Sequence, residues 1–305
     1  MGKVSLCPMS MLRSLVRWMM RNLFVVGLGL LCLCGSPSPA KASALSPAMT
    51  PVVSSPLMIL TNQDIDRLDG VSRAATAAGG RGDFELAEQG WTQIIEEMPD
   101  NAAAWSNRGN IRVGLNQLDA AIEDYTHSIE LAPDITDPYI NRGAVYEAQQ
   151  DWAAAIADYN QAIAIDEHDP AAYNNRGNAK ARQGDWNGAL SDYQTATFID
   201  PKFSLAQLNV AFAKYELGQD EQALRELRSL VRKYPSFVDA RAALTAAYWQ
   251  QGQTGQAESN WVAVNGLDQR YQDIDWVENV RRWPPRLVLG LRSFLALESP
   301  HRADS

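Results

Sequence analysis

The sequence repeats itself every 34 residues between positions 68 and 271. In six consecutive segments, without a gap, the eighth position is small, the twentieth is alanine and the twenty-fourth is large and mostly aromatic. A period in this range indicates supersecondary units that cannot bury their apolar faces alone and therefore stack on one another. The alanines are Ala87, Ala121, Ala155, Ala189, Ala223 and Ala257.

Each segment is expected to form two antiparallel helices. The first helix should end near position 15, which is glycine in four of the six segments. The second should end before a proline in four segments, because proline disfavours helix in the residue before it. Small residues at positions 8 and 20 let the two helices approach, and the side chain at position 24 fills the space beside them. The prolines are Pro99, Pro133, Pro201 and Pro235.

Trp105, Gly109, Ala121, Tyr125 and Pro133 resemble the signature of the tetratricopeptide-repeat (TPR) family. This resemblance implies an all-α fold, a right-handed α-solenoid of about six helix-turn-helix repeats. Position 7, usually leucine in the family, is Arg108, Arg142 and Arg176 here, within an Asn-Arg-Gly sequence similar to repeats of cyanobacterial and bacterial proteins. The expected repeats are 68–101, 102–135, 136–169, 170–203, 204–237 and 238–271.

The first 44 residues have the order of a secretory signal peptide. Arg13, Arg17 and Arg21 precede an apolar run over 23–34, and small residues suited to cleavage follow. The run is shorter than the roughly 20 residues that cross a bilayer, which favours a cleaved signal peptide over the alternative, a retained membrane anchor. We expect an exported protein, in the periplasm or thylakoid lumen, with membrane association as an open alternative, and a proline-rich linker over 45–67. All three cysteines lie in the leader, which excludes disulfides from the mature chain.

Charge and motif content argue against several function classes. Beyond residue 44 the chain has 22 basic and 36 acidic residues, and this negative net charge would repel nucleic acid. The three histidines, His127, His168 and His301, are scattered, and no glycine-rich phosphate loop occurs. The acidic residues are expected at solvent positions of the helices. We therefore predict no catalytic residue, metal, cofactor or small-molecule substrate, and a protein or peptide as the partner.

By resemblance to the family, positions 2, 5, 6, 9, 12 and 13 of the first helices face a concave groove. These positions are polar in repeats two to four and apolar in repeats five and six, where a partner or the chain's own C-terminal segment would cover them. The polar candidates for peptide binding are Asn107, Asn141, Asn174, Asn175, Asn178, Arg182 and Asn209. The apolar candidates are Leu205, Leu208, Phe212, Tyr215 and Trp249.

Position 6 is asparagine in four successive repeats, at Asn107, Asn141, Asn175 and Asn209. The arrangement is similar to the asparagine ladder with which some family members hold an extended peptide backbone, since an amide both donates and accepts. Asparagine at position 6 also belongs to the family consensus, where it serves structure. Both interpretations remain open from the sequence.

The segment 272–305 follows the repeats. A helix is expected over 273–282, then a corner at Trp283-Pro284-Pro285, then a short apolar helix over 287–297. The last helix, with Leu287, Leu291, Phe294 and Leu295, is expected to cap the final repeat; its alternative is contact with a membrane surface through 286–297. The whole pattern predicts a non-catalytic scaffold or assembly factor, in service of a membrane complex such as a photosystem; the alternative is a peripheral membrane tether.

Overall fold

The structure is a computed structural model that describes residues 61–298, so the predicted signal peptide lies outside the described residues. The described part contains only helices and divides into two compact units between Asn116 and Gln117. The first unit holds α2 (Asn62–Arg81), α3 (Phe84–Glu97) and α4 (Ala102–Gly114). α3 packs against both α2 and α4, around a core that includes Leu68 and Trp91.

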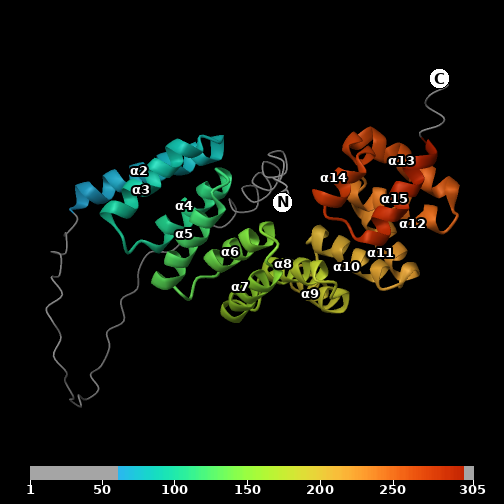
Figure 1. Ribbon diagram of the computed structural model, residues 1–305, viewed down its shortest axis with the longest axis horizontal. Helices are drawn as coiled ribbons and strands as arrows, with labels where there is room; N and C mark the ends of the chain where they lie inside the picture. Colours follow the sequence, from blue (N-terminus) through green and yellow to red (C-terminus); the bar gives the residue numbers. More distant parts are fainter. Residues whose placement is uncertain (1–60, 299–305) are drawn as a thin grey trace, which may run out of the picture. The chain divides into compact units, whose positions relative to one another are not determined.

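The second unit consists of helix pairs in which each helix packs against the next along the chain (Figure 1). Its last pair is followed by a short 3-10 helix and two further helices. The elements are α5 (Leu118–Leu131), α6 (Thr136–Ala148), α7 (Trp152–Ile165), α8 (Pro170–Arg182), α9 (Trp186–Ile199), α10 (Ser204–Glu216), α11 (Asp220–Lys233), α12 (Val238–Gln250), α13 (Thr254–Leu267), η1 (Gln269–Gln272), α14 (Ile274–Asn279) and α15 (Pro285–Glu298).

The predicted helix ends at position 15 are confirmed. All six of these residues have a left-handed backbone conformation, which suits glycine and is strained for the other two, Asn116 and Gln150, at φ 62° and 63°. The prolines also follow the second helices as expected; α9, for example, ends at Ile199, two residues before Pro201. At the N-termini, Asp151 and Asp185 cap α7 and α9 by accepting hydrogen bonds from backbone N–H groups.

The alternation of small and large residues has the predicted packing role. A Cβ atom added at Gly143 would lie 2.7 Å from the ring of Tyr159, and one added at Gly177 would lie 2.6 Å from the ring of Tyr193. The position-8 glycines therefore make room for the position-24 rings. Ala155 and Ala189, at position 20, are fully buried beside them.

Two boundaries differ from the sequence prediction. The linker expected over 45–67 is too long, because α2 already begins at Asn62, where Thr61 forms a capping box with Asp64. The helix expected over 273–282 is shorter and runs from Ile274 to Asn279. It ends early because Arg282 takes a left-handed conformation, at φ 57°, ahead of the proline corner.

The expectation that acidic residues lie at solvent positions is wrong for the position-23 aspartates, since Asp124, Asp158 and Asp192 are buried. Two of them pair with the position-7 arginine of the same repeat. Arg142 donates from Nε and Nη2 to the two oxygens of Asp158, both at 2.8 Å, and Arg176 binds Asp192 in the same way at 2.9 and 2.7 Å.

The same arginines also reach back to the preceding repeat. Arg142 Nη1 donates to Thr126 Oγ1 at 2.8 Å, and Arg176 Nη1 donates to Asn160 Oδ1 at 2.7 Å. Each arginine therefore ties three helices together through a bidentate ion pair and one further hydrogen bond. The replacement of the usual family leucine is a structural feature of these repeats rather than a groove contact.

Candidate partner-binding surface

Most of the predicted polar candidates lie together on α8 and α10. Asn209 Nδ2 donates to Asn174 Oδ1 at 2.9 Å and to Asn178 Oδ1 at 3.3 Å. Asn178 also accepts from the hydroxyl of Tyr193 at 2.9 Å. These asparagines bind one another between two repeats, which supports a structural role for them.

The other polar candidates are placed differently. Asn141 on α6 is buried, Asn175 on α8 is partly exposed, and Arg182 at the end of α8 is exposed. Asn107 lies partly exposed on α4, in the first unit. Within the second unit, Asn175 and Arg182 are thus the polar candidates most accessible to a partner.

The apolar candidates are covered by the chain's own C-terminal segment. Phe212 meets the indole of Trp283 edge-on, with ring centroids 5.4 Å apart, and Trp249 meets Phe294 edge-on at 5.3 Å. Leu208 and Tyr215 are almost fully buried, and Leu205 packs against the same core. The sequence left open whether a partner or the C-terminal segment covers these residues, and in the structure the C-terminal segment covers them. In this structure the five residues are therefore a seat for α15 and the corner before it, not an open site.

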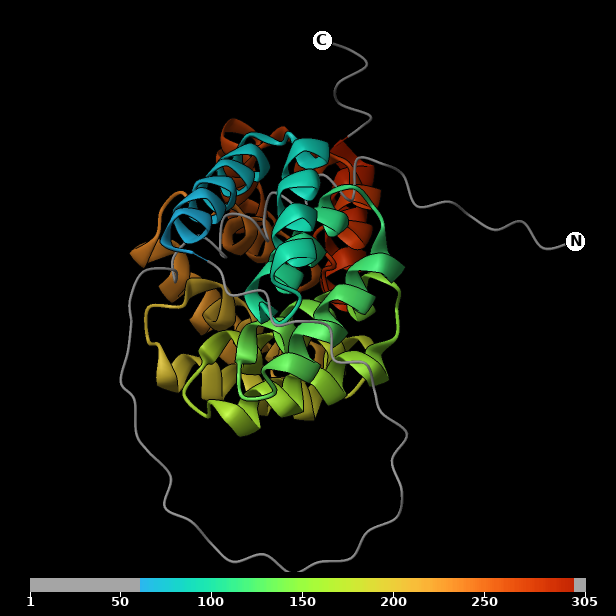
Figure 2. The same ribbon diagram turned by 90° about the vertical axis from the view of Figure 1, so that its left-hand side faces the viewer.

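The helix α15 lies beside α12, in the orange-to-red part of the chain (Figures 1 and 2), and also contacts α10. Its apolar face, Leu287, Leu291 and Phe294, is almost completely buried, whereas Leu289 is 60% exposed. The face that would contact a membrane in the tether interpretation is therefore packed inside the second unit. No helix of the described residues is both long and apolar enough to span a bilayer.

Arginines fix the C-terminal segment at three points. Arg281 Nε donates to Asp239 Oδ1 at 3.0 Å, and that carboxylate also accepts from Tyr271 and from Trp283 Nε1. Arg286 forms two hydrogen bonds with Asp220, at 3.0 and 3.1 Å. Because Asp239 is buried and Asp220 is partly buried, each carboxylate needs its arginine as a partner, and the two pairs hold the segment in place.

The third point joins the corner before α15 to α6. Arg282 Nη1 lies 3.4 Å from Glu147 Oε2, and Glu147 Oε1 accepts from the hydroxyl of Tyr159 at 2.8 Å. Burial raises the pKa of Glu147 to about 7, although the hydrogen bond from Tyr159 and the charge of Arg282 both act to lower it. The contact between Arg282 and Glu147 is consequently sensitive to pH near neutrality.

The residues of this docking were not found by sequence reasoning. Asp239 and Glu147, at positions 2 and 12 of their repeats, were expected to face the groove, but their burial against the C-terminal segment was not predicted. The available signal was their position on first helices, at repeat positions that face the groove. A carboxylate there needs a cation, and the arginines at 281, 282 and 286 are close in sequence to the corner.

Comparison with known families identifies the repeats. A TPR repeat model matches residues 148–184, and two tetratricopeptide repeat models match residues 72–134 and 205–236. The chain is a tetratricopeptide-repeat protein. No curated protein matches the sequence.

Solved structures share this fold at low sequence identity. A tetratricopeptide repeat protein from Parabacteroides merdae ATCC 43184 is 18% identical, with a TM-score of 0.60 over 75% of this chain and 92% of that one. The Cut9–Hcn1 hetero-tetramer of APC/C matches at 16% identity and a TM-score of 0.59, over 72% of this chain and 44% of that one. YrrB, described as a TPR protein with an unusual peptide-binding site, matches at 17% identity and a TM-score of 0.50, over 67% and 97%.

These likenesses define the fold of the chain and not its ligand. Tetratricopeptide repeats indicate a scaffold for protein–protein interaction, and this is the class of protein to which the chain belongs. Proteins of this class are generally non-catalytic.

Proposed function

We propose that the protein is a non-catalytic scaffold that holds an extended segment of a partner protein against the first helices α6 and α8. The proposal rests on a contact within the chain. The first helices α10 and α12 already hold a polypeptide, which is the C-terminal segment of the same chain. That segment uses apolar anchors flanked by arginine–carboxylate pairs, the chemistry by which tetratricopeptide helices would also hold another chain.

The exposed surface of α6 and α8 differs from the occupied one. It carries the partly exposed Asn175, the exposed Arg182 and small side chains such as Ala144 and Ala171. Small residues let a peptide backbone approach, an amide can donate to and accept from that backbone, and an arginine can bind a carboxylate bidentately. A polar, extended peptide suits this surface better than an amphipathic helix.

The proposal includes export and a role in assembling a membrane complex, in the periplasm or the thylakoid lumen. Its support is the order of basic, apolar and small residues in the first 44 positions and the absence of cysteine after Cys34. N-terminal sequencing of the purified protein tests the export part. A start at Ser43 or Leu45 agrees with it, and a cytoplasmic protein that begins near Met1 contradicts it.

Co-purification followed by mass spectrometry would identify the partner, and titration with its segment would test the surface. The variant Asn175→Ala/Arg182→Ala should bind about tenfold or more weakly, as expected for losing one hydrogen bond and one ion pair at an interface. The control Asn187→Ala/Arg73→Ala removes the same groups from exposed positions elsewhere and should bind like the wild type. Equal binding by both variants would place the partner on another surface.

A further inference from the structure

A second surface of the protein lies where the repeat pattern of charges breaks down. In the third and fourth repeats the position-7 arginine fills the junction with the preceding repeat, as Arg142 does between Asp158 and Thr126. In the fifth and sixth repeats position 7 is Val210 and Leu244. At each of these two junctions the structure has a hollow, of about 400 Å³ and about 660 Å³ respectively. The shorter side chains leave the space that the arginine fills elsewhere.

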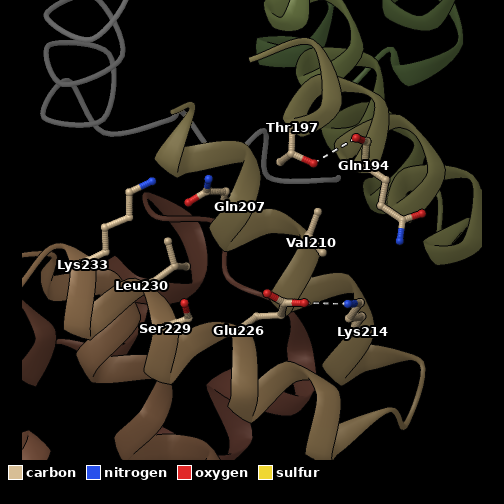
Figure 3. Close-up of a pocket in the computed structure, with 9 residues that line it drawn as sticks. All are labelled: Gln194, Thr197, Gln207, Val210, Lys214, Glu226, Ser229, Leu230 and Lys233. Atoms are coloured by element: carbon tan, nitrogen blue, oxygen red, sulfur yellow. Dashed lines mark hydrogen bonds and ion pairs between the residues drawn. The ribbon is translucent and has the colours of Figure 1, made fainter. Parts of the chain in front are cut away.

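The smaller hollow still has paired charges. It lies between α9, α10 and α11, and Lys214 Nζ is 2.9 Å from Glu226 Oε1 at its edge (Figure 3). Glu226 is the position-23 residue, equivalent to Asp158 and Asp192. Its carboxylate is matched by a cation from the preceding helix, α10, so of the charged residues that line this hollow only Lys233 is outside the pair.

The larger hollow has no such pair of a carboxylate and a cation. It lies between α11, α12 and α13, and its lining includes Arg225, Arg228 and Arg232. Position 23 is here Asn260, an amide in place of the carboxylate of the earlier repeats. Among the described residues, no carboxylate lies within ion-pairing distance of these three arginines, although Arg228 Nε donates to the carbonyl oxygen of Leu224.

The larger hollow also has an apolar floor, formed by Val231, Leu244 and Tyr248. Leu244 and Tyr248 lie on the side of α12 opposite to Ala246 and Gln250, which contact Gly290 and Arg286 of the C-terminal segment. The hollow is consequently separate from the seat of α15 and from the surface of α6 and α8.

We propose that the larger hollow binds an acidic peptide segment of a partner protein, with one apolar side chain on the floor and its carboxylates on the three arginines. The arginines are spaced i, i+3 and i+7 along one helix, a rise of about 10.5 Å from first to last. An extended peptide rises about 3.3 Å per residue, so two acidic residues three positions apart, with an apolar residue between them, fit the spacing.

The charge of the chain favours a peptide over a polyanionic surface. The protein has a net charge of −9, and the basic cluster is confined to one helix. A membrane or a nucleic acid would meet the surrounding negative field over a wide area, whereas a short peptide meets only the arginines and the floor. The arginine side chains are exposed, so they can reorient to form bidentate contacts with carboxylates.

An array of short synthetic peptides tests this proposal on the full chain. Each member carries an apolar residue between acidic ones, and each has a counterpart in which Asn and Gln replace the acids. We expect binding by acidic members, loss of binding by their amide counterparts, and weakening as salt is raised. If no acidic member binds, or if the amide counterparts bind equally well, the proposal is wrong.

Two variants locate the binding. Arg225→Gln/Arg228→Gln/Arg232→Gln should bind acidic peptides about tenfold more weakly, about 1.4 kcal/mol over three exposed charge pairs. The control Arg73→Gln/Arg81→Gln/Arg292→Gln makes the same change in net charge at exposed positions and should bind normally. Equal loss in both sets would mean attraction by overall charge alone. Vesicles that contain phosphatidylserine provide the last outcome: binding to them but not to peptides would overturn the proposal.

Discussion

Removing the ring of Phe294 should measure how strongly the C-terminal segment is held. This side chain is 1% exposed and meets Trp249 and Trp261 edge-on, at 5.3 and 5.4 Å between ring centroids. A buried Phe→Ala change costs about 3–5 kcal/mol through lost burial and the cavity left behind. Because α15 is at the end of the described chain, the loss is limited to the free energy with which the segment docks.

The expected change in melting temperature follows from this loss. One kcal/mol lowers the melting temperature of a domain of this size by about 2–4 °C, so Phe294→Ala should lower it by about 6 °C or more. Circular dichroism follows the helices, and tryptophan fluorescence follows Trp249, Trp261 and Trp283 around the site. The matched control is Leu289→Ala on the same helix, where the side chain is 60% exposed and the change should stay within about 0.5 kcal/mol. Equal melting temperatures for the two variants would refute the docking of α15.

Three further changes test other contacts. Asp158→Ala should cost about 3 kcal/mol in chemical denaturation, because Arg142 keeps a partly buried charge without its partner; replacing both residues by leucine should cost less. Glu147→Gln should raise the melting temperature at pH 8 but not at pH 4. Burial raises the pKa of Glu147 in the folded state to about 7, so the stability that the protonated carboxyl contributes below about pH 4.5 is lost as the pH rises towards 7. Gln150→Gly should raise the free energy of unfolding by up to about 1 kcal/mol, since the left-handed backbone at φ 63° favours glycine; a decrease would contradict that assignment.

The repeats themselves were predictable from the sequence. The period determines where small and large residues meet, and helices α4, α6, α8, α10 and α12 begin at the positions from which the 34-residue segments were counted. The ion pairs of positions 7 and 23 also left a signal. Arginine and aspartate occur together at these positions in three repeats, and neither occurs in the fifth or sixth, where the hollows lie. Sequence reasoning noted the arginines but did not pair them with acids 16 residues away.

The cover of the apolar groove could not be assigned from the sequence. Apolar residues such as Phe212 and Trp249 are expected at these positions whether a partner or the chain itself covers them. The C-terminal segment also lies outside the repeat, so the 34-residue period does not predict its position relative to α10 or α12. Its position depends on the corner at Trp283 and on contacts such as Arg281 with Asp239, which join residues 42 apart. Tertiary contacts of this kind leave no periodic pattern.

Photo-crosslinking from two positions in the fourth repeat would show whether the partner lies on α8. A benzophenone side chain at position 175 would lie on α8, on the surface proposed to hold the partner, and one at position 187 would lie exposed on α9 of the same repeat. With the partner that co-purifies with the full chain, we expect crosslinks from position 175 and none from position 187. Crosslinks from position 187 alone, or equally from both positions, would contradict the proposed surface.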